Sequence, residues 1–383
     1  MNKAMRREIS PFIAMEVFKA ANLREQAGDP VFHMEVGQPA TSAPSRVIEA
    51  AKRALDGEQI GYTNALGITP LREAIAKHYK DFYGVEVSPE RVIVTTGSSG
   101  GFLLSFLSAF ERGDNVVLAE PGYPAYRNIL TSLDLNPIGL PCDASTNFQP
   151  TPELIDRLEG PLHGLLVASP SNPAGTMLHR NELAALVEYC QDRNMPFISD
   201  EIYHGITYEE PATTALELTD DAIIINSFSK FFSMTGWRLG WMVVPERMVA
   251  DIEKLAQNLF ISPPALSQHA AVAAFEDMSE LEGYVTNYAR NRELLLRELP
   301  KLGLDKLASA DGAFYIYADV REFTNDSMAF CQRMLEETGV AAAPGLDFDP
   351  HRGNGFVRFS FAGSFATIEA AIDRLKRWPV LHR

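Results

Sequence analysis

The chain has 383 residues, of which 46% are apolar, and its formal net charge is −16. This length favours about two or three domains, and the acidity excludes nucleic acid and anionic membranes as expected partners. There is no apolar run of transmembrane length or signal-peptide core, the eight histidines lack ligand spacing, and the three cysteines, Cys142, Cys190 and Cys331, are scattered. We therefore expect a cytoplasmic protein with reduced thiols and no metal site.

The first 30 residues predict an arm and then a helix, with Ser10 as the cap and Pro11 at the first helical position. An amphipathic helix packed on the core is the simpler interpretation, and a wall of a substrate pocket is the alternative. Residues 31–39 predict a strand that ends in glycine and proline. Gly37 either makes a turn or lets a substrate carboxylate approach bare backbone.

Helical patterns at 45–55 and 71–83 flank a polar loop that contains Tyr62, which is either an ordinary loop aromatic or a donor to an anion. A strand at 92–96 then leads through a tight turn into an apolar helix at 102–110. Gly97, Ser98 and Ser99 in this turn offer backbone N–H groups, hydroxyls and the positive end of a helix dipole. The turn therefore predicts an anion site, although it matches neither a nucleoside-triphosphate loop nor a full dinucleotide fingerprint.

Polar or aromatic residues also follow the next strands. Tyr123 follows the strand at 116–119 and has a proline on either side, so it either covers a planar ring or is a structural aromatic. The strand at 165–168 leads into a loop that contains Asn172, and the strand at 197–199 runs directly into Asp200. A buried carboxylate at Asp200 needs a partner, either a protonated pyridine nitrogen or an arginine.

The apolar run 222–226 releases the chain into a loop that carries Lys230 and Arg238. Apolar neighbours would desolvate the Lys230 ammonium and lower its pKa toward a nucleophilic amine. Arg238 offers a fork of donors suited to a phosphate. A solvated lysine and a surface arginine are the simpler alternative, but together the two residues indicate a cofactor with an aldehyde and a phosphate, which pyridoxal phosphate satisfies.

Five apolar strands are each followed at once by such a cluster, and they end near Thr96, Ala119, Ala168, Ser199 and Asn226. Their alternation with helices predicts βαβ units and a mostly parallel sheet. Because the carboxyl ends of parallel strands share one edge of a sheet, the clusters should converge on one site.

The pattern changes beyond residue 280, where helices at 284–299, 327–337 and 366–377 alternate with strands at 313–318, 340–343 and 356–361. We expect a smaller α+β domain. The predicted division is an N-terminal segment, 1–45, packing with the small domain, a large domain, 46–280, and a small domain, 281–383. Arg358, among apolar neighbours, needs either a fixed glutamate or a substrate carboxylate.

From Val36-Gly37-Gln38-Pro39 to Arg358 the sequence resembles the fold-type-I aminotransferases of class I and II, with all motifs in family order. The pattern Ser-x-Ser-Lys-x-x-x-Met-x-Gly-x-Arg-x-Gly at 227–240 is the most specific of them. The resemblance implies an α/β large domain with a mostly parallel sheet flanked by helices, pyridoxal phosphate as cofactor, and a homodimer with shared sites. The implied reaction is ping-pong transfer of an amino group from an L-amino acid to a 2-oxo acid.

The resemblance also implies roles for individual residues. Lys230 would bind the cofactor as a Schiff base and move the proton, Asp200 would pair with the pyridine nitrogen, and Tyr123 would stack on the ring. Tyr203 and Asn172 would bind the phenolic oxygen, and Arg358, Asn172 and the Gly37 backbone would bind the substrate α-carboxylate. The phosphate would be held by Gly97, Ser98, Ser99, Ser227, Ser229, Arg238 and, from the neighbouring subunit, Tyr62.

One residue departs from part of the family. Several dicarboxylate-specific relatives carry a lysine in the phosphate turn, where this sequence has Ser99, which weakens an aspartate assignment. A carbon–sulfur β-lyase on the same scaffold is the nearer alternative function. A non-enzymatic effector-binding module is more distant, because it implies an attached DNA-binding domain, for which we expect no room in the first ten residues.

Overall fold

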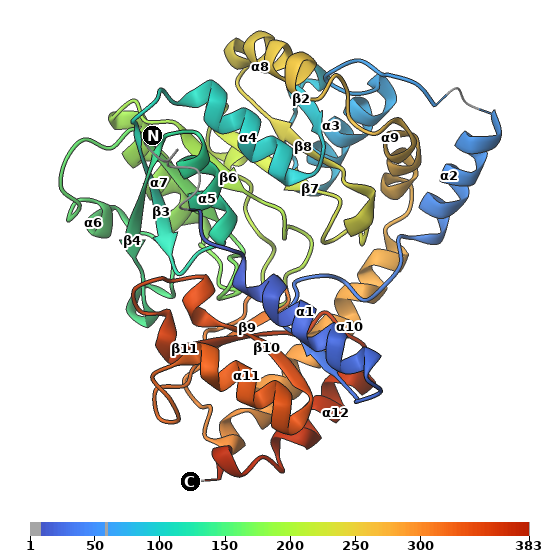
Figure 1. Ribbon diagram of the computed structural model, residues 1–383. Helices are drawn as coiled ribbons and strands as arrows, with labels where there is room; N and C mark the ends of the chain where they lie inside the picture. Colours follow the sequence, from blue (N-terminus) through green and yellow to red (C-terminus); the bar gives the residue numbers. More distant parts are fainter. Residues whose placement is uncertain (1–8, 58–59, 383) are drawn as a thin grey trace, which may run out of the picture.

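The computed structural model describes residues 9–57 and 60–382, so most of the predicted N-terminal arm lies outside the described residues. The described strands form one seven-stranded and one four-stranded sheet. Figure 1 shows the larger sheet and its helices above the smaller one, with helix α1 (Ile13–Gln26) lying across the boundary between them. Of the described helices, none is both long and apolar enough to cross a membrane.

The larger sheet has the strand order β2-β8-β7-β6-β5-β3-β4. Only β8 runs against its neighbours, so the expected mostly parallel sheet is confirmed. We did not predict β4, because Pro137 and Gly139 interrupt its pattern, as is tolerated in a strand at the edge of a sheet. The strands are β2 (Val92–Thr95), β3 (Asn115–Glu120), β4 (Asn136–Pro141), β5 (Gly164–Ala168), β6 (Phe197–Asp200), β7 (Ile223–Ser227) and β8 (Gly240–Val243).

Helices cover both faces of this sheet. Neighbouring residues of a strand point to opposite faces, and accordingly Ile223 and Ile225 pack in one apolar cluster while Ile224 packs in the other. The first cluster includes α4 (Ser98–Ala109), α5 (Pro124–Ser132) and α8 (Glu246–Leu259), and the second includes α3 (Thr69–Tyr83) and α7 (Arg180–Asp192). Burial on both faces explains why these strands are almost continuously apolar. The remaining helices here are α2 (Ser45–Gly57), α6 (Pro152–Ile155) and α9 (Ala265–Val272).

The smaller sheet has the order β1-β10-β11-β9 and joins segments from both ends of the chain. Its strands are β1 (Phe32–Met34), β9 (Tyr315–Asp319), β10 (Val340–Pro344) and β11 (Phe356–Ser360), and its helices include α10 (Ser279–Glu298), α11 (Ser327–Thr338) and α12 (Phe365–Leu375). Strand β1 pairs in parallel with β10. It is shorter than the strand predicted over 31–39, since the chain turns toward the larger sheet after Met34.

Helix α1 begins at Ile13, not next to the predicted cap Ser10. The carboxylate of Asp347 accepts hydrogen bonds from the backbone N–H groups of Ile13 (3.1 Å) and Ala14 (3.0 Å). A side chain more than 300 residues away in sequence therefore satisfies the first turn of α1, as a local cap would. This contact fixes α1 at the boundary between the two sheets.

Candidate active site

A cavity of about 480 Å³ opens where the carboxyl ends of the larger sheet meet α1, β9 and β11. The expected convergence of the strand ends is therefore observed. Several of the predicted site residues line this cavity: Gly37, Ser98, Ser99, Tyr123, Asn172, Tyr203, Ser229, Lys230, Arg238 and Arg358.

Lys230 lies three residues beyond the end of β7 and is partly exposed to the cavity. Its Nζ donates to the backbone carbonyl of Gly37 at 2.6 Å and lies 5.7 Å from the centre of the Tyr203 ring. Burial and the positive charge of Arg358 lower the pKa of Lys230 to about 8, and the charge of Asp200 only partly opposes this shift. About a tenth of this amine is therefore unprotonated at pH 7, far more than for an ordinary lysine, and the neutral amine is the form that a nucleophile requires.

Asp200 is the last residue of β6 and is 2% exposed. The hydroxyl of Tyr126 and the backbone N–H of Ile202 (3.1 Å) donate to its carboxylate. Burial raises the pKa of Asp200 to about 6, against the effect of these two hydrogen bonds. Within the described chain no arginine, lysine or histidine forms an ion pair with Asp200, so no described residue fills the arginine alternative.

Tyr126 also lines the cavity, although the sequence analysis assigned it no role. It follows Tyr123 by three residues in the first turn of α5, and the two rings lie 5.3 Å apart. Residues at this spacing share a face of a helix. This spacing was the available signal that both tyrosines face the same site.

Gly97, the first turn of α4 and Arg238 form an anion cradle. The helix begins at Ser98, earlier than the start at 102 that we predicted, so Ser98 and Ser99 lie in its first turn. Gly97 precedes α4 with a φ of 76°, and a methyl group on it would lie 2.7 Å from Nη2 of Arg238. Ser98, Ser99 and Ser229 line the cavity beside Arg238, which forms no ion pair with the described residues. Ser227 lies behind this wall, where its Oγ accepts from the Ser229 N–H at 3.0 Å. Nη1 of Arg238 donates to the backbone carbonyl of Thr235 at 3.2 Å. A helix N-terminus beside a guanidinium without a described ion-pair partner is suited to a phosphate.

Arg358 is buried in β11 with 2% exposure. Its Nη1 donates to Oδ1 of Asn172 at 2.8 Å, and its Nη2 donates to the backbone carbonyl of Glu35. Its Nε is buried and has no hydrogen-bond partner among the residues that the structure describes. The sequence left open a glutamate as the fixed partner of Arg358, but no described glutamate forms an ion pair with it. The nearby Glu35 carboxylate binds His33 at 2.7 Å instead. A buried guanidinium with neutral partners is suited to a carboxylate that arrives with a substrate.

Helix α1 contributes Met15 and Phe18 to the cavity wall, and Phe12, which directly precedes the helix, also lines it. Of the two interpretations that the sequence left open for this helix, the wall of a pocket is therefore the one observed. Phe12 packs edge-to-face on Tyr123, with ring centres 5.8 Å apart. Burial raises the pKa of Tyr123 to about 12, so its phenol stays protonated at neutral pH.

Two hydroxyls meet on the other side of the cavity. Oη of Tyr203 lies 2.7 Å from Oη of Tyr315, a residue for which we predicted no role. Tyr62, in contrast, is 83% exposed and does not line the cavity of its own chain.

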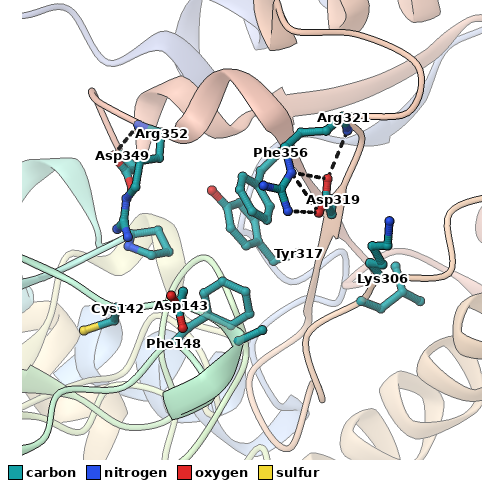
Figure 2. A pocket seen from close by; sticks show the side chains of 13 residues that line it. Cys142, Asp143, Phe148, Lys306, Tyr317, Asp319, Arg321, Asp349, Arg352 and Phe356 are labelled. Carbon is teal, nitrogen blue, oxygen red and sulfur yellow. Dashed lines mark hydrogen bonds and ion pairs between the residues drawn. The ribbon is translucent and has the colours of Figure 1, made fainter.

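A larger cavity of about 670 Å³ lies between residues 142–148 and the smaller sheet. Figure 2 shows Tyr317 and Phe356 stacked in its wall and charged side chains at its ends. Four of these charged residues form two ion pairs, Arg352 with Asp349 at 2.7 Å and Arg321 with Asp319. Because none of the predicted site residues lines this cavity, we assign the chemistry to the smaller one.

The family model "Aminotransferase class I and II" matches residues 29–375. A valine–pyruvate aminotransferase of Mycobacterium tuberculosis is 48% identical over 379 residues, which cover 98% of each chain. A crystal structure of an aminotransferase from the same organism has a TM-score of 0.96 at 47% identity and 99% coverage of both chains. That of an aspartate aminotransferase from Thermotoga maritima has a TM-score of 0.91 at 31% identity, covering 98% of this chain and 99% of the other. The chain therefore belongs to the class I and II aminotransferase family and is an aminotransferase.

Proposed function

We propose that the protein uses pyridoxal phosphate to transfer the amino group of a neutral, apolar L-amino acid to a 2-oxo acid by ping-pong chemistry. The observation that carries this proposal is the Lys230 amine, with its pKa lowered to about 8, in one cavity with the anion cradle and Arg358. An amine, a phosphate site and a carboxylate site in one cavity match the groups of the cofactor and its substrate.

The residues present fit this cofactor. Its aldehyde requires an amine, its phosphate requires a cradle of donors, and its pyridine nitrogen requires a carboxylate. Lys230, the first turn of α4 with Arg238, and Asp200 supply these groups, and Asp200 has no cationic partner of its own in the described chain. The full set proposed to hold the cofactor is Gly97, Ser98, Ser99, Tyr123, Asn172, Asp200, Tyr203, Ser227, Ser229, Lys230, Arg238 and, from a second subunit, Tyr62.

When bound, the cofactor supplies the carbon that receives the amino group and a ring that delocalises the electrons released at the substrate Cα. The protein supplies orientation and proton transfer. Arg358, Asn172 and the Gly37 backbone hold the α-carboxylate and so fix the direction of the Cα–H bond. Lys230 would take the proton from the substrate Cα and deliver it across the amino nitrogen to the carbon that receives the amino group, and its pKa near 8 suits both directions at neutral pH. Asp200 keeps a proton on the pyridine nitrogen.

The cavity wall supports an apolar substrate side chain. Phe12, Met15 and Phe18 line it, and Ser99 occupies the turn position where several dicarboxylate-specific relatives have a lysine. In the described part of this chain, the cationic residues that line the cavity are limited to Lys230, Arg238 and Arg358. Each already has a role, so a second substrate carboxylate meets no free cation from this subunit. The relative named valine–pyruvate aminotransferase, at 48% identity, supports valine as donor and pyruvate as acceptor.

Aspartate as donor is the second candidate, supported by the structural similarity to the Thermotoga aspartate aminotransferase. We further propose a cytoplasmic homodimer with shared active sites. The exposed ring of Tyr62 supports this, because it is free to enter a neighbouring subunit. The proposed domains are an N-terminal segment, 1–45, a large domain, 46–280, and a small domain, 281–383, and the pairing of β1 with β10 supports placing the N-terminal segment with the small domain.

The test is a comparison of half-reactions on the cofactor-loaded protein. The decay of the cofactor absorbance is followed with L-valine, L-alanine and L-aspartate, and pyruvate release from a cysteine conjugate is measured without any oxo acid. We expect kcat/KM for valine to exceed that for aspartate at least about tenfold, since one unpaired buried carboxylate costs more than 1.4 kcal/mol. Ser99→Lys should raise the aspartate value relative to the valine value. An aspartate preference in the unmodified protein would support the second candidate, and rapid pyruvate release would support a β-lyase.

A further inference from the structure

We propose that Tyr315 is a positioning residue that links the cofactor pocket to the substrate-carboxylate site, its hydroxyl donating to Tyr203 and its ring supporting Arg358. The inference rests on the proposed function, because Tyr203 and Arg358 are proposed to contact cofactor and substrate. Tyr315 touches both of these residues, whereas its own hydroxyl has no other partner in the described structure.

The contacts of Tyr315 are short and buried. It is the first residue of β9 and is 1% exposed. Its Oη lies 2.7 Å from Oη of Tyr203, which is 3% exposed. On another side, the guanidinium carbon of Arg358 lies 4.4 Å from the centre of the Tyr315 ring. One side chain thus contacts both a proposed cofactor-binding residue and a proposed substrate-binding residue.

Gly37 accommodates this arrangement. A methyl group on Gly37 would overlap the Tyr315 hydroxyl and lie 2.7 Å from Cζ of its ring. The carbonyl of the same glycine accepts the hydrogen bond from Nζ of Lys230. A side chain at this position would therefore displace Tyr315 or the backbone that orients Lys230. The need for glycine here comes from Tyr315, a reason that neither sequence interpretation of Gly37 contained.

The direction of the hydrogen bond follows from counting protons. Burial raises the pKa of both Tyr203 and Tyr315, so both phenols keep their protons at neutral pH. If Tyr203 donates its one proton to the phenolic oxygen of the cofactor, the proton between the two tyrosines must come from Tyr315. Hydrogen-bonded hydroxyls in series polarise each other, so Tyr315 strengthens the donation by Tyr203.

The sheet holds Tyr315 beside Arg358. Strands β9 and β11 are antiparallel, with Tyr317 opposite Arg358 and Tyr315 opposite Ser360. Tyr315 and Arg358 are therefore diagonal neighbours on one face, close enough for long side chains to meet. A cation over an aromatic face is held electrostatically, and more strongly where water is excluded.

The hydroxyl and the ring can be tested separately. Tyr315→Phe removes only the hydroxyl, and Tyr315→Leu also removes the ring. Tyr317→Phe is the matched control, because Tyr317 lies two residues along the same strand and is 2% exposed. Its hydroxyl is also buried and has no hydrogen-bond partner within residues 9–57 and 60–382. Figure 2 shows that Tyr317 lies in the wall of the other cavity.

The readout for the hydroxyl is the pH midpoint of the absorbance change of the bound cofactor. Tyr315→Phe should raise this midpoint by about half a unit to one unit, because a weaker donor stabilises the anionic phenolic oxygen less. Tyr203→Phe should raise it further, and the double variant should match Tyr203→Phe alone, since Tyr315 acts through Tyr203. Tyr317→Phe should leave the midpoint unchanged.

The readout for the ring is KM for L-valine. Tyr315→Leu should raise KM about threefold to thirtyfold, and Tyr315→Phe should change it less than twofold. Three outcomes would overturn the inference while leaving the proposed function intact. They are fully additive midpoint shifts in the double variant, an unchanged midpoint in Tyr315→Phe, and an equal midpoint shift in Tyr317→Phe. A wild-type protein that shows no cofactor absorbance after incubation with pyridoxal phosphate would overturn both.

Discussion

Replacement of Arg358 by methionine should separate substrate binding from stability. The guanidinium is 2% exposed, its two identified partners are the neutral oxygens of Asn172 and Glu35, and no carboxylate of the described chain neutralises it. The rings of Tyr315 and Phe348 lie against the guanidinium and Asp347 interacts with it electrostatically, but a substrate carboxylate would be its first ion-pair partner among these groups. Removing one partner of such a buried pair costs about 2 to 5 kcal/mol. This corresponds to a loss of about thirtyfold to several-thousandfold in kcat/KM.

The assay compares L-valine with isobutylamine, which has the same side chain but lacks the α-carboxylate. The loss in Arg358→Met should appear with valine and disappear with isobutylamine, because the amine has no group for the guanidinium to bind. Thermal unfolding of the substrate-free protein should change little, since two lost hydrogen bonds are offset by the removal of an unneutralised buried charge.

Arg352→Met provides the opposite control. Arg352 binds Asp349 at 2.7 Å outside the active site, and Asp349 is itself 2% exposed. Its loss leaves a buried carboxylate unpaired, so this variant should unfold at a lower temperature with kcat/KM unchanged. The reasoning about Arg358 would be refuted by an equal loss of activity with valine and isobutylamine, or by a loss below about fivefold with valine.

Three further outcomes are expected. Tyr126→Phe removes a hydrogen bond that lowers the pKa of Asp200, so this pKa should rise further above about 6. The Kd for pyridoxal phosphate, measured by titration at pH 7, should then increase about tenfold. An unchanged Kd would argue against this role of Tyr126. In the cofactor-free protein, labelling of Lys230 by an amine-selective reagent should rise with pH through a midpoint near 8, because burial disfavours the ammonium; a midpoint at the ordinary value of 10.5 would contradict this. Mixing equal amounts of Tyr62→Ala and Lys230→Ala subunits should restore about a quarter of wild-type activity, since half of the dimers would contain one intact site; no recovery after confirmed subunit exchange would count against a shared site.

Local patterns in the sequence predicted the large sheet and much of the cavity wall. Lys230, Asp200 and Asn172 each follow an apolar strand, and parallel strands bring their carboxyl ends to one edge. The turn at Gly97, Ser98 and Ser99 was recognisable for the same reason. These predictions needed only strand periodicity and the direction of parallel strands, which neighbouring residues encode.

Other contacts join segments that are far apart in the chain, and no periodic pattern marks them. Tyr203 and Tyr315 are separated by 112 positions, and Asp347 caps α1 across more than 300 positions. Ser10 was the expected cap because capping rules consider only adjacent residues, whereas the packing of α1 against the loop after β10 brings Asp347 closer. Tyr126 shared a helix face with Tyr123, but only the tertiary structure shows that its hydroxyl reaches Asp200.

The sequence by itself thus determined five of the seven strands of the larger sheet, their parallel direction and the chemical groups at their carboxyl ends, because these depend on short-range periodicity and the identity of residues at strand ends. The partners of those groups were decided only when the smaller sheet and α1 closed over that edge. Which hydroxyl faces Tyr203, and which oxygens face Arg358, depends on side-chain packing between distant segments, where a shift of about one ångström makes or breaks a hydrogen bond.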